Sequence, residues 1–289
     1  MGSHHHESRH RHDAAGETDS AATIELLDLD AEVMHSYLSE VAGWVHGLAT
    51  DRPCRRIVDL GCGTGSGALA LARRFEAADV IAVDMSAPLL ARLSAKARDL
   101  GLADRIRTVE ADLDRVWPTM APVDLAWASN SLHHMSDPDR VVAEIFATIR
   151  PGGLLAVAEM ESFPRFLPDD IGLGRPGLEA RSHAAAAYAL ADELPHLGDD
   201  WGARLRQAGF TIEAERRFVI DLTRPLPAAT GRYAQASLRR MRAGLDGRLS
   251  ADDLATLDTL VDSDGSVGVL GRDDLTVRAA RTVWVARRP

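Results

Sequence analysis

Apolar and polar residues follow helix and strand periods along nearly the whole chain. From Leu26 to Leu48, apolar residues recur at three- and four-residue steps, which predicts an amphipathic helix. Further on, short apolar runs predict strands, and segments with helical periodicity lie between them. The predicted strands are residues 55–60, 79–84, 105–112, 123–130 and 154–160, and the predicted helices are residues 67–75, 88–101, 137–150 and 201–209.

This alternation of strands and helices predicts the fold class. It is typical of an α/β protein, in which a parallel, doubly wound sheet carries helices on both faces. Two long strands with charges at alternate positions, 211–222 and 276–288, close the chain and belong at one edge. We expect a mostly parallel seven-stranded sheet with an antiparallel edge strand and helical insertions over the active site.

Two segments, 161–198 and 224–273, fall outside the alternation. Ligands of open α/β sheets bind beyond the carboxyl ends of the strands, so insertions that follow strands are expected to cover the substrate. We therefore predict a single domain over residues 23–289, with a cofactor-binding core at 55–160. Residues 1–22 are rich in histidine and nearly free of apolar residues, which predicts a disordered tail.

Composition and charge exclude several function classes. The net charge of −10 disfavours a nucleic-acid partner, which requires a dense basic face. No apolar stretch is long enough for a membrane span. The two cysteines, Cys54 and Cys62, cannot form a disulfide framework, which favours a reducing, cytoplasmic location. We expect no metal site, and we expect Cys62 to have a packing role.

The segment VDLGCGTGSG, residues 58–67, carries the first chemical signal. Four glycines directly after an apolar strand indicate a turn without room for side chains or a backbone that lies against a ligand. The spacing departs from the dinucleotide pattern G-x-G-x-x-G, because Gly61 and Gly63 fit it but the third position falls on Ser66. The loop by itself leaves the kind of nucleotide cofactor open.

Acidic residues at the strand ends narrow the choice of cofactor. Asp84 ends the second strand, where a carboxylate can accept both hydroxyls of a ribose. Asp59 and Asp112 lie on the same rim, and three carboxylates there disfavour the pyrophosphate of a dinucleotide. A cationic sulfonium attached to a ribose and an adenine suits this rim better. The sequence therefore favours S-adenosylmethionine.

The same segments resemble a known family. VDLGCGTG, IAVDMS, EADLD and SNSLHHMSDPDRVVAEIFATIRPGGLLAVAE are similar, in this order, to class I S-adenosylmethionine-dependent methyltransferases, of the small-molecule type related to the quinone-biosynthesis enzymes. The similarity covers residues 55–160 closely and the last two strands loosely. The segment SNSLHH stands where DNA amino-methyltransferases have Asn/Asp-Pro-Pro-Tyr, so the resemblance implies a free small molecule as acceptor.

The resemblance implies a role for each matching position. Gly61 and Gly63 would let the backbone approach the methionine part of the cofactor, with Asp59 supporting that loop and Asn130 facing the same part. The remaining implied contacts are Asp84 with the ribose, Met85 with the adenine ring, Asp112 with the adenine amino group, and Leu113 beside it. Met85 and Leu113 also suit plain core packing.

Methyl transfer is an in-line displacement, and a base assists only where the acceptor must lose a proton. His133 and His134 follow the fourth strand on the ligand rim, and Glu159 ends the fifth strand on the same rim. These three are the candidate catalytic residues. Adjacent residues point in different directions, so we expect at most one of the two histidines to face the pocket, and His134 is favoured. Capping or local hydrogen bonds are the alternative roles for the histidines. His35 and Tyr37, in the N-terminal helix, are candidates for closing over the cofactor.

No motif identifies the acceptor. The apolar residues of the insertions and the following helix favour an apolar acceptor, although they also suit packing of the cover on the sheet; they are Phe163, Phe166, Leu167, Trp201 and Leu226. Two alternatives to a small-molecule methyltransferase stay open. One is a catalytically inactive S-adenosylmethionine-binding regulatory protein, and the other, which the glycine spacing and acidic rim disfavour, is an NAD-dependent oxidoreductase.

Overall fold

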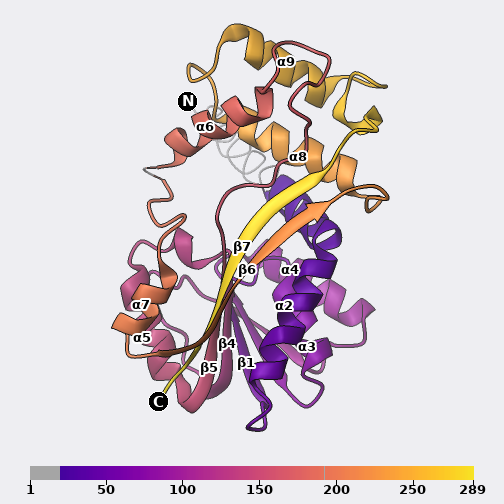
Figure 1. Ribbon diagram of the computed structural model, residues 1–289. Coiled ribbons are helices and arrows are strands. Elements are labelled where there is room, and N and C mark those ends of the chain that lie inside the picture. The colour runs from indigo at the N-terminus through magenta and orange to yellow at the C-terminus, as the bar shows by residue number, and fades with distance from the viewer. Residues whose placement is uncertain (1–19, 192) are drawn as a thin grey trace, which may run out of the picture.

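A computed structural model describes residues 20–191 and 193–289 of the chain (Figure 1). The predicted tail lies outside the described residues up to position 19, and residues 20–22 are helical. The centre of the molecule is a seven-stranded sheet with the order β3-β2-β1-β4-β5-β7-β6. The strands are β1 (Arg56–Leu60), β2 (Asp79–Asp84), β3 (Ile106–Glu110), β4 (Val123–Ser129), β5 (Ile149–Met160), β6 (Thr211–Leu222) and β7 (Val277–Arg287).

Strand direction confirms the predicted fold class. β3, β2, β1, β4 and β5 are all parallel, whereas β7 runs antiparallel to both of its neighbours, β5 and β6. The antiparallel strand β7 is therefore inserted between β5 and the edge strand β6. Because the strand order reverses between β1 and β4, the carboxyl ends of β1, β2 and β4 meet at a topological switch point.

Helices cover both faces of the sheet and also form a separate layer at one end. The helices are residues 20–33, α2 (His35–Leu48), α3 (Ser66–Arg74), α4 (Ala87–Asp99), α5 (Pro138–Thr148), α6 (Leu178–Leu190), α7 (Trp201–Gln207), α8 (Thr230–Ala243) and α9 (Ala251–Asp262), with short 3₁₀ turns η1 (Leu132–His134) and η2 (Val269–Gly271). In Figure 1, α6, α8 and α9 lie together beyond the end of the sheet that β6 and β7 reach. These three helices come from the two insertions.

Side chains of alternate strand positions build two cores, one on each face. Ile57 packs into the core beneath α2, α3 and α4, and its neighbour Val58 packs into the core beneath α5 and α7. The insertions are bound to the sheet through the first of these cores. Phe166 of the first insertion is fully buried and meets Tyr233 of α8 edge-on at 5.1 Å between ring centroids. No helix of the described residues combines the length and apolarity that crossing a membrane requires.

Two elements differ from the sequence prediction. The expected single helix over 26–48 is interrupted at Met34, which has φ −91° and ψ 14° between the helical residues 20–33 and α2. The strand expected at 154–160 begins already at Ile149, directly after α5, and runs through Pro151 and Gly152 with a register shift against β4. Gly152 has φ +79°, which lets the strand include this irregularity.

Candidate functional site

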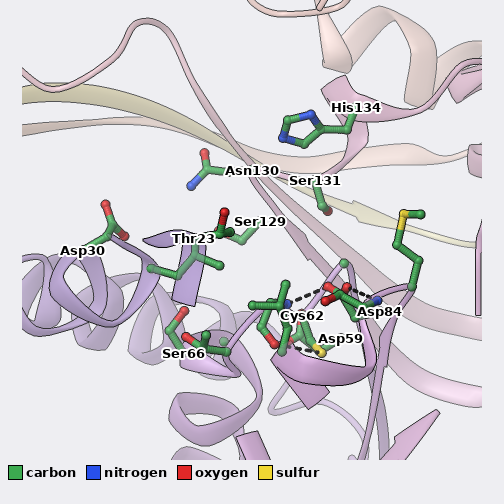
Figure 2. Close-up of a pocket in the computed structure, with 18 of the residues that line it drawn as sticks. Thr23, Asp30, Asp59, Cys62, Ser66, Asp84, Ser129, Asn130, Ser131 and His134 are labelled. Carbon is green, nitrogen blue, oxygen red and sulfur yellow. Dashed lines mark hydrogen bonds between the residues drawn. The ribbon is translucent and has the colours of Figure 1, made fainter. Parts of the chain in front are cut away.

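A cavity of about 570 Å³ opens at the switch point of the sheet. Its walls come from the glycine loop after β1, the ends of β2 and β4, the turn before η1, and the helical residues 20–33. Residues of α2, α8 and β7 complete the wall on the side of the insertions. Figure 2 shows Asp59, Cys62 and Asp84 near the glycine loop, with His134 across the cavity from them. We call the side formed by the glycine loop and the end of β2 the loop end, and the side formed by residues of α2, α8 and β7 the cover end.

The glycine loop turns tightly against its neighbours. Gly61 has φ +66°, and a Cβ added there would lie 2.5 Å from the Cβ of Ser131. Gly63 has φ +54°, and an added Cβ would lie 3.3 Å from Leu27 in the first helix. Any other residue at Gly61 would be strained in backbone conformation and would also clash. The loop therefore presents bare backbone to the cavity.

Asp84 fixes the loop to the end of β2. Its Oδ2 accepts a hydrogen bond from the Gly63 N–H at 2.8 Å, and its Oδ1 accepts from the Ser86 N–H at 2.9 Å. The half-buried carboxylate lines the cavity, and each oxygen has a second lone pair for a further donor. Asp84 can thus support the loop and bind a ligand hydroxyl at the same time.

Asp59 is a buried carboxylate with an unsatisfied oxygen. It is 2% exposed, and its Oδ2 has no hydrogen-bond partner among the described residues. Burial raises the pKa of Asp59 to about 7, a hydrogen bond from the Ala68 backbone opposes the rise, and Asp84 adds to it. A Cβ added at Gly67 would lie 2.8 Å from this oxygen and 2.8 Å from Trp127 Nε1, which is also unpartnered in the described chain. The glycine leaves space beside two unpaired polar atoms.

The turn after β4 is held in a strained conformation. Asn130 has φ +50°, the only positive φ of a non-glycine residue in the part of the chain that the structure describes. Its backbone N–H donates to the Ala158 carbonyl at 2.8 Å, and its side-chain Oδ1 is buried without a partner among these residues. Strain of this kind is retained where the surrounding structure fixes it, and it is frequent at ligand sites. Asn130 lines the cavity between the loop end and the cover end (Figure 2).

Glu159 anchors this turn from β5. It is 3% exposed, and its Oε1 accepts from the backbone N–H groups of Ser131 at 3.3 Å and Leu132 at 3.0 Å. Its Oε2 lies 2.5 Å from Nδ1 of His133, which is 2% exposed. His133 and Glu159 thus form a buried pair behind the cavity wall. Neither is among the described residues that line the cavity.

His134 is the histidine that reaches the cavity. Its ring centroid lies 4.2 Å from that of His133. The ring is open to the cavity, and the protein around it lowers the pKa of His134 to about 4, chiefly by desolvation and then through the nearby His133 and Arg240. His134 is therefore uncharged at neutral pH, with a ring nitrogen available as a hydrogen-bond acceptor.

The residues that the resemblance assigns to the adenine lie where the ends of β2 and β3 meet. Asp112 lines the cavity, and its Oδ1 accepts from the Asp114 N–H at 3.0 Å while Oδ2 lies 3.2 Å from the Arg115 Nε. Met85 is 66% exposed beside the cavity, and Leu113 is buried at its wall. Met85 therefore does not pack in the core, whereas Leu113 belongs to the core beneath α5 and α7.

The cover end holds residues from four separate elements. Arg281 of β7 is buried, its Nη2 donates to Asp30 Oδ1 at 3.0 Å, and its guanidinium lies over the Tyr37 ring at 5.0 Å. Tyr233 Oη also donates to Asp30 Oδ1, at 2.6 Å. This network joins the first helix, α2, α8 and β7 around the cavity. Asp30 and Arg281 line the cavity. Neither was identified from the sequence, because no local pattern marks either residue.

The structure brings together most of the residues selected from the sequence. All eight predicted cofactor-binding residues line the one cavity; they are Asp59, Gly61, Gly63, Asp84, Met85, Asp112, Leu113 and Asn130. Of the three catalytic candidates, His134 lines the cavity and the other two lie behind it. Tyr37 also lines the cavity, whereas His35 borders a second cavity between the N-terminal helices, α3 and α4.

The apolar residues predicted to surround the acceptor have other surroundings. Phe166, Leu167 and Trp201 are buried in the two cores at 1%, 1% and 0% exposure. The described cavity lining contains none of them, nor Phe163 or Leu226. These side chains fix the cover and α7 to the sheet. An apolar acceptor remains a prediction that they do not support.

Comparison with known proteins gives a consistent result. Residues 57–153 match a family model described as a methyltransferase domain. The chain is 34% identical over 169 residues to a trans-aconitate 2-methyltransferase of Acidovorax sp. (strain JS42), a match that covers 58% of this chain and 59% of that protein. It is 28% identical over 179 residues to the 27-O-demethylrifamycin SV methyltransferase of Amycolatopsis mediterranei (strain S699), covering 62% of each.

A trans-aconitate 2-methyltransferase of Deinococcus radiodurans is 34% identical over 113 residues, which are 39% of this chain and 41% of that one. The chain thus spans about half the length of the curated relatives it matches. Among solved structures, a putative methyltransferase from Bacillus halodurans superposes with a TM-score of 0.53 at 15% identity, covering 84% of this chain and 98% of that one. The YcgJ protein of Bacillus subtilis gives a TM-score of 0.53 at 15% identity, covering 86% and 98%. These two structures share the fold.

Proposed function

We propose that this chain is a class I, S-adenosylmethionine-dependent methyltransferase, which transfers a methyl group from S-adenosylmethionine to a small-molecule acceptor; the match of residues 57–153 to a methyltransferase domain supports the proposal. The observation that carries the proposal is a pair of buried acceptor atoms in the cavity, Asp59 Oδ2 and Asn130 Oδ1. Buried acceptors without donors are costly, and a cationic ligand with an ammonium group would satisfy them.

The residues of the loop end fit the proposed cofactor. Asp59 and Asn130 would hold the amino group of the methionine part, and the bare backbone at Gly61 and Gly63 would lie against that part. Asp84 would bind the ribose hydroxyls, and Asp112 would accept from the adenine amino group, with Met85 and Leu113 on either side of the ring. Three carboxylates at this end fit a cation and disfavour a pyrophosphate.

The proposed chemistry needs few groups from the protein. S-adenosylmethionine supplies a methyl group on positive sulfur; a lone pair of the acceptor forms the new bond to carbon, and the electrons of the carbon–sulfur bond stay on sulfur. The cavity walls hold the acceptor in line and exclude water. His134 is placed to accept a hydrogen bond from the acceptor, and its low pKa makes it a weak base.

His133 and Glu159 have a positioning role in this proposal. The Glu159 carboxylate binds the backbone of the turn and the His133 ring at once, so it fixes the orientation of the segment that ends in His134. Neither side chain contacts the cavity in the described structure. Their removal would therefore change turnover through the position of His134 and Asn130.

For the methyl acceptor, the partners and the cellular location, the proposal names only a class. Relatives are named for trans-aconitate and for a rifamycin as methyl acceptors, which supports a free small molecule here and makes trans-aconitate a first compound to assay. The acidic net charge supports the absence of a nucleic-acid partner. Cys54 and Cys62 are free thiols, which supports a reducing, cytoplasmic location.

The test is calorimetric titration with S-adenosylmethionine, S-adenosylhomocysteine and NAD. We expect both adenosyl compounds to bind and NAD not to bind. Asp84→Ala should weaken binding by at least about tenfold, because hydrogen bonds to a carboxylate contribute roughly 1.5–3 kcal/mol each. The matched control is Glu110→Gln, since Glu110 pairs in register with Asp84, is exposed and does not line the described cavity.

Two results would separate the alternatives. Binding of NAD in place of both adenosyl compounds would overturn the proposal and favour the oxidoreductase. Binding of the adenosyl compounds without production of S-adenosylhomocysteine, across trans-aconitate and a broad acceptor panel, would favour the inactive cofactor-binding protein. Turnover with any acceptor establishes the enzyme.

A further inference from the structure

Four buried polar atoms without hydrogen-bond partners among the described residues belong to side chains that line the cavity. Two of them, Asp59 Oδ2 and Asn130 Oδ1, are acceptors, which the proposed function assigns to the amino group of the methionine part. The other two are donors, Trp127 Nε1 and the Tyr37 hydroxyl, which keeps its proton because burial raises the pKa of Tyr37. An ammonium group has no lone pair, so these donors require an acceptor elsewhere on the ligand.

Arg281 of β7 adds further donors next to Tyr37. Its side chain is 5% exposed and lines the cavity, and its guanidinium lies 5.0 Å from the centroid of the Tyr37 ring. Of its five N–H donors, the described structure pairs only Nη2, which donates to Asp30 Oδ1 at 3.0 Å. Tyr233 donates to the same oxygen. A buried guanidinium with unused donors beside an unpartnered hydroxyl indicates an anionic group in the cavity.

The sheet places Arg281 and Asp59 on the same face. One row of register partners crosses the sheet from β1 through β4 and β5 to β7; it consists of Asp59, Trp127, Ala156 and Val285. Register partners share a face, and side chains along a strand return to that face at every second position. Arg281 precedes Val285 by four positions, so its side chain extends from the same face as that of Asp59.

Asn130 lies between β1 and β7 at the same end of the sheet. Its N–H donates to the carbonyl of Ala158 in β5, and Ala158 pairs in register with Val283, two positions from Arg281. This register puts the backbones of Asn130 and Arg281 roughly 12 Å apart. In Figure 2 the Asn130 side chain extends toward the side of the cavity on which Asp30, the partner of Arg281, lies. The unpartnered acceptors and the unused donors therefore face one region.

We propose that Arg281 and Tyr37 bind the carboxylate of the cofactor's methionine part. The inference rests on the proposed function and assigns residues to a contact that the proposed function leaves open. The ammonium and carboxylate groups of an α-amino acid share one carbon, so acceptors and donors that face one region fit the two charges of one group. A planar guanidinium suits a carboxylate, because it offers parallel N–H donors to both oxygens.

Both residues lie outside residues 57–153, the segment that matches the methyltransferase domain model. Tyr37 belongs to α2 and Arg281 to β7, and Asp30 of the first helix has a positioning role, because it holds Arg281 Nη2. Tyr233 of α8 holds Asp30 in turn. Recognition of the cofactor therefore depends on the N-terminal helices, the second insertion and the last strand as well as on the glycine loop.

The experiment compares adenosyl ligands that differ in one group. Calorimetry measures binding of S-adenosylhomocysteine, of its decarboxylated analogue, which keeps the amino group, and of 5′-methylthioadenosine, which lacks both groups. We expect the wild type to prefer S-adenosylhomocysteine over the decarboxylated analogue by at least about tenfold, as hydrogen bonds between charged groups support. Arg281→Gln should reduce this preference to about twofold or less, and Tyr37→Phe should reduce it by roughly threefold. Neither variant should weaken binding of the decarboxylated analogue.

Arg216→Gln is the matched control. Arg216 also lies over an aromatic ring, that of Phe218 at 4.2 Å, and pairs with a carboxylate, but it is absent from the described cavity lining. This variant should keep the wild-type preference. If Arg281→Gln does not fold, Tyr37→Phe, which removes only a hydroxyl, decides the question.

Two results would overturn the proposal alone. One is equal binding of S-adenosylhomocysteine and its decarboxylated analogue by the wild type, which would leave Arg281 to the methyl acceptor. The other is an unchanged preference in the folded variants. Failure of all three adenosyl ligands to bind the wild type would instead refute the proposed function, and the carboxylate contact with it.

Discussion

The buried carboxyl of Asp59 predicts a defined pH dependence of stability. Its folded-state pKa is raised from 3.8 to about 7, mainly by burial. Between these values the unfolded chain has released the proton and the folded chain still holds it, so the free energy of unfolding falls as pH rises from about 4 to about 7. The displacement of the pKa corresponds to about 4 kcal/mol.

Asp59→Asn isolates this effect. The amide is close in shape to the protonated carboxyl and does not titrate. The free energy of unfolding of the variant should therefore not show the fall with rising pH that Asp59 causes in the wild type. We expect the unfolding free energy of Asp59→Asn, minus that of wild type, to increase by about 4 kcal/mol between pH 4 and pH 8. Urea unfolding of both proteins at several pH values measures the difference. Asp79→Asn, on the exposed start of β2, controls for the loss of one negative charge.

Binding of S-adenosylhomocysteine should lower the pKa of Asp59 again. A bound ammonium group beside Asp59 Oδ2 stabilises the ionised carboxylate, so binding near pH 6 should release a proton. Calorimetric titration of S-adenosylhomocysteine in two buffers of different ionisation enthalpy detects that proton, and Asp59→Asn should abolish its release. A stability difference that stays constant within about 1 kcal/mol from pH 4 to pH 8 would refute the reasoning, since the carboxyl would then not be protonated in the folded protein.

Three further predictions concern the loop and the turn. Gly65→Ala should lower the unfolding free energy by about 2–4 kcal/mol in urea, because φ is +85° and the added Cβ would lie 2.1 Å from Leu93 Cδ1. In a Leu93→Ala background the same change should cost less, and strict additivity of the two losses would contradict the clash. Glu159→Gln should lower the free energy of unfolding by about 2–3 kcal/mol and reduce kcat, while S-adenosylhomocysteine binding persists, because Glu159 acts by positioning the turn and His133. An unchanged kcat would exclude that positioning role. His134→Gln should leave the shape of the pH–rate profile between pH 5.5 and 8 unchanged, because the pKa of His134 lies near 4; a limb near pH 6.5 that disappears in the variant would argue against a neutral ring.

Much of the architecture follows from local patterns. Apolar runs separated by helical segments predict the parallel sheet, and glycine and aspartate at the strand ends predict where the ligand binds. The carboxyl ends of neighbouring parallel strands converge at a switch point, so residues such as Asp59, Asp84 and Asn130, far apart in sequence, could be assigned to one site. The details of element ends were less predictable, because the break at Met34 depends on packing.

The sequence by itself determined the alternation of strands and helices, the glycine loop and the acidic residues of the loop end, because each depends on short-range periodicity or on the topology of a doubly wound sheet. Only the tertiary structure decided which of two adjacent histidines faces the cavity, since Glu159 holds His133 in the interior. It alone showed that Tyr37, Arg240 and Arg281 line the same cavity. Those three belong to separate elements with no shared motif, and their common place in the lining depends on how the insertions pack on the sheet.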